Sequence, residues 1–93
     1  MARYVTLLRF TDQGARSLNK SADRALAFKE AAEKAGVKVE SQLWTVGSHD
    51  GVLILSGDER KILRSLTQLA ATGNVRTETL QAFDTQEFKA VTG

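Results

Sequence analysis

The chain has 93 residues, of which 42% are hydrophobic and 26% are charged, a composition typical of a globular protein rather than of a disordered or membrane one. It contains no Cys, so disulfides, thiol nucleophiles and Cys-based metal sites are excluded. Thirteen Lys and Arg residues against eleven Asp and Glu residues give a net charge of +2 with the two signs interleaved, which does not favour nucleic acid as a partner.

Length and hydropathy limit the organisation of the chain. The length falls near the low end of the usual ~50 to 250 residues of one domain, so we expect one domain over residues 1–93. No apolar run approaches the ~20 residues that a membrane helix needs, and the N-terminus lacks the apolar core of a signal peptide. The expected location is therefore the cytoplasm, with no membrane partner.

Residues 3–10 predict the first strand. Apolar side chains fall on both of its faces, with Tyr4, Leu8 and Phe10 on one and Val5 and Leu7 on the other. An antiparallel edge strand usually keeps one polar face, so we expect this strand at the centre of its sheet. The polar residues 11–20 follow as a loop that has room for a short helical turn.

The first long helix is expected over residues 21–35, with Ser21 as its N-cap and Gly36 as the residue that ends it. Its buried face is predicted to hold Ala25, Phe28, Ala31, Ala32 and Ala35. Arg24 lies at the margin of that face. Its guanidinium either extends to solvent or turns toward a pocket, and solvent is the commoner outcome.

A hairpin follows, and its two strands differ in pattern. Residues 37–46 alternate, with Val37, Val39, Ser41 and Leu43 on one side and Lys38, Glu40, Gln42 and Trp44 on the other. The second of these faces is polar for most of its length, which predicts an edge strand. Residues 52–56 are apolar throughout, which predicts a strand that is buried on both faces.

The second long helix is expected to begin after Asp58, its N-cap, and to end at residues 72–74. Its predicted buried stripe consists of Ile62, Leu63, Leu66, Leu69 and Ala70. Residues 74–83 predict the last strand, at the second edge of the sheet. A capping-box pattern at residues 84–87 predicts a short helix or an arm over residues 84–93.

The order strand, helix, strand, strand, helix, strand is that of the split βαβ or ferredoxin-like arrangement, an α+β fold. Right-handed crossovers place the first and third strands at the centre of a four-stranded antiparallel sheet, in agreement with their apolar patterns. The two helices can cover only one face of this sheet, yet the central strands are apolar on both. A second copy of the chain is the simplest cover, so we expect a homodimer or a higher oligomer.

Short motifs along most of the chain resemble those of a known family. They are Phe10–Gly14, Lys20–Arg24, Ala27–Phe28, Trp44–Asp50, Gly73–Thr79 and Ala82–Phe83. In order and spacing they are similar to the GYD-domain family, a prokaryotic group related to the dimeric α/β barrels. His49 stands where the family's Gly-x-Tyr-Asp motif has Tyr. The resemblance implies a ferredoxin-like fold of the dimeric α/β-barrel type and paired subunits, and it implies no particular activity.

His49 is the candidate catalytic residue, because an imidazole can act as a general base near neutral pH. Asp50 could orient such a base, although neighbouring residues at a strand end point apart. The alternative is that Asp50, with Gly47 and Gly51, serves the tight turn by accepting backbone N–H groups. A single His gives no credible metal site, and the sequence predicts no cofactor.

Candidate ligand-binding residues lie at one end of the predicted sheet. The last strand is expected beside the first, so Arg76 or Thr77 could approach the first loop's Thr11, Asp12 and Gln13. Those groups could ring a cleft for a small polar or anionic ligand. The alternative is that Arg76 forms an ion pair with a Glu of its own strand and that Thr77 only suits β structure.

Trp44, the sole Trp, could line a ligand pocket or anchor a subunit interface, and packing in an interface or core is the commoner use. Arg24 and Asp50 complete the candidate ligand-binding residues. The main functional hypothesis is a small oligomeric module that binds a small molecule or a partner protein through the sheet face and its loops. One alternative is a cofactor-independent oxygenase or isomerase with His49 as base and Arg76 as anion stabiliser. The other is a purely structural assembly domain, so whether the chain is an enzyme is left open.

Overall fold

The computed structural model describes all 93 residues. The elements in chain order are β1 (Ala2–Phe10), α1 (Asp12–Arg16), the 3₁₀ turn η1 (Leu18–Lys20), α2 (Ser21–Lys34), β2 (Lys38–Trp44), β3 (Gly51–Gly57), α3 (Glu59–Ala71), β4 (Val75–Gln81) and α4 (Thr85–Thr92). The strands form one antiparallel sheet in the order β2-β3-β1-β4. The predicted ferredoxin-like α+β fold, with the first and third strands in the centre, is confirmed.

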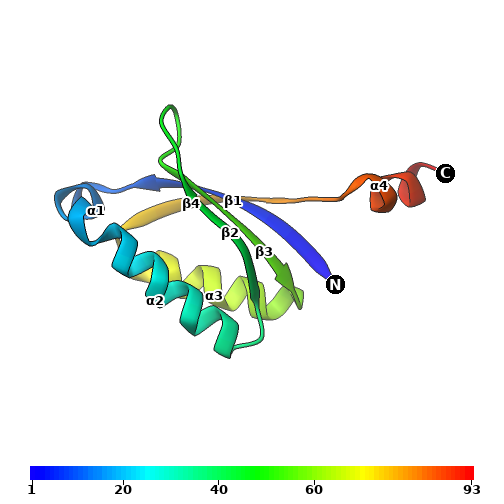
Figure 1. Cartoon of the computed structure of the whole chain (residues 1–93), viewed down its shortest axis with the longest axis horizontal. Helices are drawn as coiled ribbons and strands as arrows, with labels where there is room; N and C mark the ends of the chain where they lie inside the picture. Colours follow the sequence, from blue (N-terminus) through cyan, green and yellow to red (C-terminus); the bar gives the residue numbers. More distant parts are fainter.

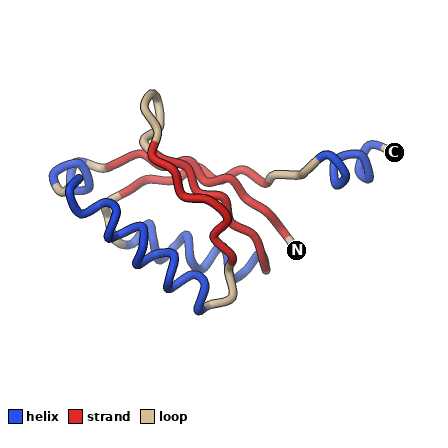
Figure 2. The backbone as a smooth tube through the Cα atoms, in the orientation of Figure 1, coloured by secondary structure: helices blue, strands red, loops and turns tan.

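The helices α2 and α3 pack against one face of the sheet, and the opposite face carries no helix (Figures 1 and 2). The core lies between the two layers and consists of Ala32, Val37, Val39, Leu53, Leu55, Ile62 and Leu66. Leu55 and Ile62 are among its most completely buried side chains. No helix combines the length and the apolar character that crossing a membrane would require.

The sequence predicts more buried residues on the two long helices than the structure has. Four of the residues predicted to be buried are exposed, namely Ala31, Ala35, Leu63 and Ala70. A helix meets a sheet along a narrow line, so only residues near the centre of the stripe, such as Ala32 and Ile62, are enclosed. Leu63 lies on the flank of α3 beside the edge strand β4, where the sheet ends and no further layer covers it.

A β-bulge changes the pairing of β2 with β3 between Val39 and Ser41. One extra residue inverts the alternation of all that follow, because side chains in a strand point to opposite faces in turn. Gln42 and Trp44, and not Leu43, therefore face α2. The regular alternation that the sequence predicts for this strand is wrong in its second half.

Ser21 does not cap α2, contrary to the sequence prediction. The turn η1 runs directly into the helix, so Lys20 occupies the N-cap position and the Ser21 N–H donates to the Leu18 carbonyl. The Ser21 hydroxyl is thereby left to accept the indole N–H of Trp44, whose nitrogen is 2.9 Å away.

The face of the sheet opposite the helices, called here the outer face, is apolar at its centre. Val5 of β1 lies between Ile54 of β3 and Leu80 of β4, and Leu7 lies beside Val52. These side chains are half-buried or exposed. Charged residues frame them, with Arg3, Lys38 and Glu40 at one end and Arg9, Arg76 and Glu78 at the other. The chain itself leaves the outer face uncovered.

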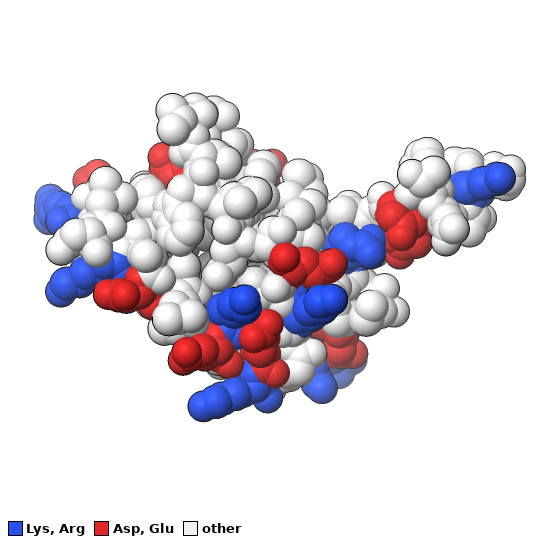
Figure 3. Space-filling view, viewed as in Figure 1, with Lys and Arg blue, Asp and Glu red and all other residues white.

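Surface charge is mixed in sign. Lys, Arg, Asp and Glu side chains intermingle over α2 and at the base of the C-terminal arm in the view of Figure 3, whereas the hairpin tip is largely white. Arg3 is paired with Glu40 and Glu87, at 3.5 and 2.6 Å. Its hydrogen bond to Glu87 raises the pKa of Arg3.

The helix α4 projects away from the body of the molecule as an arm (Figure 1). A capping box begins it, because the Asp84 carboxylate accepts the Glu87 N–H and the Glu87 carboxylate accepts the Asp84 N–H, each at 2.8 Å. The side chain of Arg3 in β1 donates to the same Glu87 carboxylate. Phe88 and Val91 are exposed on the arm. One carboxylate thus both starts the arm helix and ties it to the sheet.

Acidification is expected to fray the arm helix. The pKa of Glu87 is lowered below its ordinary value of 4.5, first by the hydrogen bond from the Asp84 N–H and then by that from Arg3. A carboxyl group with a lowered pKa stabilises the folded state above its ordinary pKa, and this contribution is lost as the pH falls through the lowered value. Amide hydrogen exchange of residues 85–92 should therefore accelerate as the pH is brought below 4.5, once corrected for the intrinsic rate.

Two variants test this assignment. Glu87→Gln removes the charge and keeps the shape, so its arm is expected to exchange faster at neutral pH and to lose the acid-induced change. Glu33→Gln, on the exposed side of α2, is the matched control and should leave the arm as in the wild type. Equal exchange of the Glu87 variant and the wild type at every pH would contradict the role given to this carboxylate.

Candidate functional site

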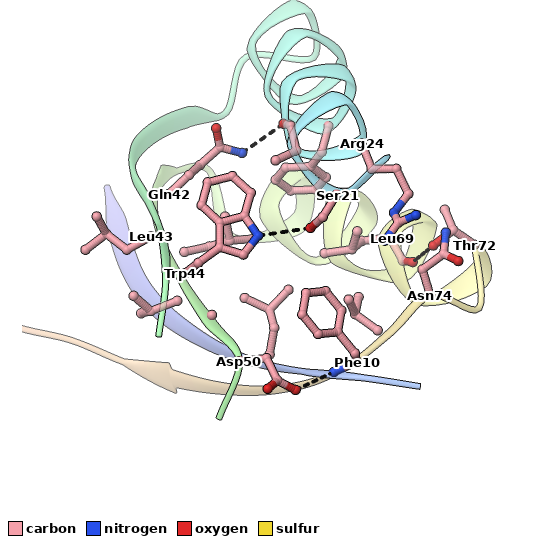
Figure 4. Close-up of a pocket in the computed structure, with 17 residues that line it drawn as sticks. Phe10, Ser21, Arg24, Gln42, Leu43, Trp44, Asp50, Leu69, Thr72 and Asn74 are labelled. Carbon is pink, nitrogen blue, oxygen red and sulfur yellow. Dashed lines mark hydrogen bonds between the residues drawn. The ribbon is translucent and has the colours of Figure 1, made fainter. Parts of the chain in front are cut away.

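A half-open pocket lies between the first turns of α2 and the sheet, close to the ends of the β2–β3 hairpin (Figure 4). Its volume is about 140 Å³. The apolar side chains that line it include Leu8, Phe10, Phe28, Trp44, Leu53 and Leu69. Elements that are distant in the sequence, namely β1, β2, β3, α2 and α3, therefore enclose one space.

Polar groups stand at opposite sides of this pocket. Ser21 and Arg24 reach it from α2, whereas Asp50 comes from the end of the hairpin beside Phe10 (Figure 4). Asn74 lines it from the turn between α3 and β4. The pocket thus has an apolar interior, a cationic side chain on the α2 side and a carboxylate on the hairpin side.

Trp44 and Gln42 join β2 to α2. The Trp44 indole N–H donates to Ser21 Oγ, and Gln42 Nε2 donates to the Ala25 carbonyl, each at 2.9 Å. The Trp44 side of the pocket remains open, since the residue is 53% exposed. The structure therefore places the candidate Trp44 in the pocket wall.

Arg24 turns toward the pocket, the less common of the two outcomes that the sequence allows. Its Nη1 donates to the carbonyl and the hydroxyl of Ser17, at 3.0 and 2.9 Å, and its Nη2 donates to the Gly14 carbonyl at 3.4 Å. All three acceptors are neutral, and the ion pairs of the chain involve other residues. A guanidinium has more N–H donors than these contacts use, so Arg24 keeps donors for a further acceptor.

Asp50 braces the end of β1. Its Oδ2 accepts the Phe10 N–H at 2.9 Å, and its own N–H donates to the Leu8 carbonyl at 2.8 Å. The Asp50 carbonyl accepts the Thr45 N–H across the hairpin at 3.0 Å. The side chain accepts a backbone N–H, as the turn interpretation expects, but the donor belongs to β1 rather than to the hairpin.

His49 lies apart from this pocket. Its Nδ1 is 3.2 Å from Ser48 Oγ, and its Nε2 is 3.8 Å from a carboxylate oxygen of Glu78, a residue of the outer face. No hydrogen bond joins the His49 side chain to Asp50. Glu78 lies two residues from Arg76 on the same face of β4, so His49 and Arg76 both belong to the outer-face side of the sheet and not to the pocket.

The first loop is tied to the turn before β4 rather than to β4 itself. Thr11 Oγ donates to the Gly73 carbonyl at 2.6 Å, and the Thr11 N–H donates to the Asn74 carbonyl at 3.1 Å. Gln13 Nε2 donates to the Thr72 carbonyl at 3.1 Å and to Asn74 Oδ1 at 2.9 Å. Thr11 and Gln13 thus position a turn that lines the pocket, without lining it themselves.

The remaining candidate residues stay outside the pocket. Asp12 is exposed in α1, and Arg76 is exposed on the outer face of β4 without an ion pair. Thr77 faces the helices and lines a second groove with Tyr4, where partial burial raises the pKa of the Tyr4 hydroxyl and the Glu59 carboxylate adds to the shift. Arg76 and Thr77 point to opposite faces of one strand, so only one of them can share a cleft with the first loop.

Comparison with known proteins confirms the family resemblance. A model of the GYD domain matches residues 4–92. The chain belongs to the GYD domain family. This GYD domain is 32% identical over 84 residues, 88% of either chain, to a Thermus thermophilus protein described as a glutamine synthetase and cystathionine beta-lyase binding protein. No solved structure shows significant similarity to it.

Several pocket residues of this GYD domain carry no functional signal in the sequence. Phe28 and Leu69 follow the helical period of ordinary core positions, and Ser21 has the position of a helix cap. Gln42 is assigned to the polar side of its strand by simple alternation, and only the bulge turns it toward α2. No group of three or more His, Asp and Glu residues forms a potential metal site.

Proposed function

We propose that this GYD domain is an oligomeric binding module, which pairs with a second copy through the outer face of its sheet and binds a partner protein. The observation that carries the proposal is the uncovered apolar face of Val5, Leu7, Val52, Ile54 and Leu80. Contiguous apolar patches with a polar rim mark interaction sites. A small domain also gains more from such a cover, because it buries a smaller share of its own surface than a large domain does.

A second copy is the occupant with the simplest geometry. Two identical sheets can stack face to face about a two-fold axis. The same residues of both copies are then buried in the interface. We propose a homodimer of this kind as the basic unit, with a higher oligomer built on it where further surfaces pair.

The partner-binding part of the proposal draws on the relative. The Thermus thermophilus protein is described as binding two enzymes, glutamine synthetase and cystathionine beta-lyase. For the present chain we propose the same class of role, the binding of another protein. The loops at the sheet ends and the exposed arm residues Phe88 and Val91 are available for that contact.

Val5→Glu tests the pairing of two copies. Sedimentation velocity should give the mass of at least two chains for the wild type at micromolar concentration and of one chain for the variant. An unpaired charge buried in an interface costs several kcal/mol. Since each 1.4 kcal/mol is tenfold in affinity, we expect the dissociation constant to rise at least about 100-fold.

Gln68→Glu introduces the same charge on the exposed side of α3 and is the matched control. It should sediment as the wild type does. A wild-type mass of one chain at micromolar concentration would refute the pairing, and so would a Val5→Glu variant that keeps its circular dichroism spectrum and still sediments as a dimer.

The partner role is tested with purified enzymes. Glutamine synthetase and cystathionine beta-lyase from the organism that supplies the chain are passed over immobilised protein, with bovine serum albumin as the control. Saturable binding of either enzyme supports the proposed role. Retention no greater than that of albumin for both would count against carrying the relative's role over to this chain.

Small-molecule binding belongs to the same proposal, because the pocket beside α2 offers a separate site for it. An enzyme that uses His49, at the family motif's Tyr position, and Arg76 remains an alternative hypothesis, but neither residue lines that pocket. The side chains that line the pocket therefore support ligand binding better than they support a reaction that uses His49 and Arg76.

A further inference from the structure

The pocket beside α2 has the size of a single aromatic ring. Its volume of about 140 Å³ is close to the ~150 Å³ of an apolar protein cavity that binds benzene. Phe10, Phe28 and Trp44 contribute aromatic surfaces to its wall, and aromatic rings pack on one another in offset or edge-to-face arrangements. The interior therefore fits one ring better than a chain of sugars or a nucleotide.

The cationic side chain that the pocket offers to a ligand is Arg24. Its three hydrogen bonds go to neutral oxygen atoms of Ser17 and Gly14, which fix the guanidinium without compensating its charge. A guanidinium with free N–H groups recognises a carboxylate by charge-assisted hydrogen bonds, often two at once. The structure thus presents a fixed cation at the edge of an apolar pocket.

The carboxylate on the other side, that of Asp50, has one neutral partner, because its Oδ2 accepts the Phe10 N–H. It lies at the hairpin end of the pocket, opposite Arg24. Arg24 also lies in the first turns of α2, where the helix dipole favours a negative charge. A negative charge is therefore favoured on the α2 side of the pocket, beside Arg24 and away from Asp50.

From these contacts we propose that the pocket binds a small aromatic carboxylic acid, with its ring among Phe10, Phe28 and Trp44 and its carboxylate on Arg24. The proposal names the ligand class within the binding function proposed above and rests on it. The outer face, where two copies are proposed to pair, lies on the other side of the sheet, and of its named apolar residues only Val52 also lines the pocket. Ligand binding and pairing can therefore be measured separately.

The test uses 3-phenylpropanoate as the probe, with its uncharged amide and with 2-phenylethylamine for comparison. Trp44 is the only Trp, so its fluorescence reports on the pocket directly. Titration of the wild type should give saturable binding of the acid, at least about tenfold weaker binding of the amide, and weaker binding still of the amine. The tenfold difference is the loss expected when one charge-assisted contact to Arg24 is removed.

Variants locate the carboxylate. Arg24→Gln should bind the acid at least about tenfold more weakly and should no longer distinguish acid from amide. Arg24→Lys keeps the charge without the planar fork and should fall between. Arg16→Gln, an exposed Arg of α1 outside the pocket, is the matched control and should bind as the wild type does.

Several results would overturn the proposal. Equal affinity for acid and amide, tighter binding of the amine, or no saturable change at millimolar acid would each do so, and none of these needs a variant that folds. If Val5→Glu bound the acid and the wild type did not, a second copy of the chain, and not a small ligand, would be the occupant of the wild-type pocket. Failure of Val5→Glu to change the mass, with ligand binding intact, would sink the pairing and leave the ligand site standing.

Discussion

Replacing Gly14 with Ala is expected to lower the free energy of unfolding by about 3 kcal/mol, the upper part of the range for overpacking. A Cβ atom at this position would lie 2.0 Å from the carbonyl oxygen of Asn74 and 2.9 Å from its carbonyl carbon. Both are backbone atoms of a carbonyl that accepts the Thr11 N–H, and Thr11 Oγ donates to the preceding carbonyl, that of Gly73. The loop and the turn before β4 must separate, which urea denaturation followed by circular dichroism would measure.

Ala15→Ser is the matched control for this substitution, because Ala15 is its exposed neighbour in α1. We expect the control to change the free energy of unfolding by less than about 0.5 kcal/mol, as surface substitutions usually do. Asn74 lines the pocket, so Gly14→Ala should also weaken binding of 3-phenylpropanoate in the part of the population that remains folded. A loss of stability below about 1 kcal/mol would contradict this close contact.

Leu55→Ala is expected to destabilise the fold by about 3 kcal/mol. Leu55 is fully buried at the centre of the core, so the truncation removes apolar contacts and leaves a cavity. A domain of this size has roughly 5 to 14 kcal/mol of stability in total, so the loss is a large part of it. The melting temperature should fall by roughly 12 to 24 °C, which calorimetry or thermal circular dichroism would record.

Leu63→Ala makes the same chemical change on the flank of α3, where the side chain is 62% exposed. Its expected cost is below about 1 kcal/mol, since little apolar area is lost from a buried environment. Similar melting temperatures for the two variants would mean that Leu55 does not occupy the centre of the core.

The topology could be predicted because the information for it is local. Strands β1 and β3 are apolar on both faces, and those are the strands that the sheet places in the centre. Asp58 caps α3 by accepting the Lys61 N–H, and Gly36 follows α2 with a φ of 90°, both as expected from residue type. Each of these features depends on a few neighbouring residues.

The side of Trp44 could not be predicted, because it depends on a bulge. Nothing in the alternation of β2 reveals that one residue is extra, and the extra residue turns Trp44 from the outer face to the helices. The sequence placed this ligand-binding candidate on the polar face of its strand, whereas the structure places it on the helix face, in the pocket wall. Its partner, the Ser21 hydroxyl, is likewise free only because η1 removes the need for a cap.

The candidate site could be predicted only in part, because it is assembled from distant segments. Arg24, Trp44 and Asp50 were candidates and do line one pocket. The sequence allowed two directions for Arg24, and the choice follows from the carbonyl groups of the first loop, which fix its guanidinium. His49 drew attention as the only His, but rarity does not determine where a loop residue points.

A sheet can be extended by further strands only where its edge offers a regular row of backbone groups. In this chain the ladder of β2 is irregular between Val39 and Ser41, whereas β4 pairs with β1 in unbroken register from Val75 to Gln81. A copy with one regular edge can pair through it with one other copy, and the assembly then ends. Growth of a fibril requires two such edges on every copy. The bulge that aims Trp44 at α2 therefore also makes the β2 edge a poorer template for a further strand than the β4 edge.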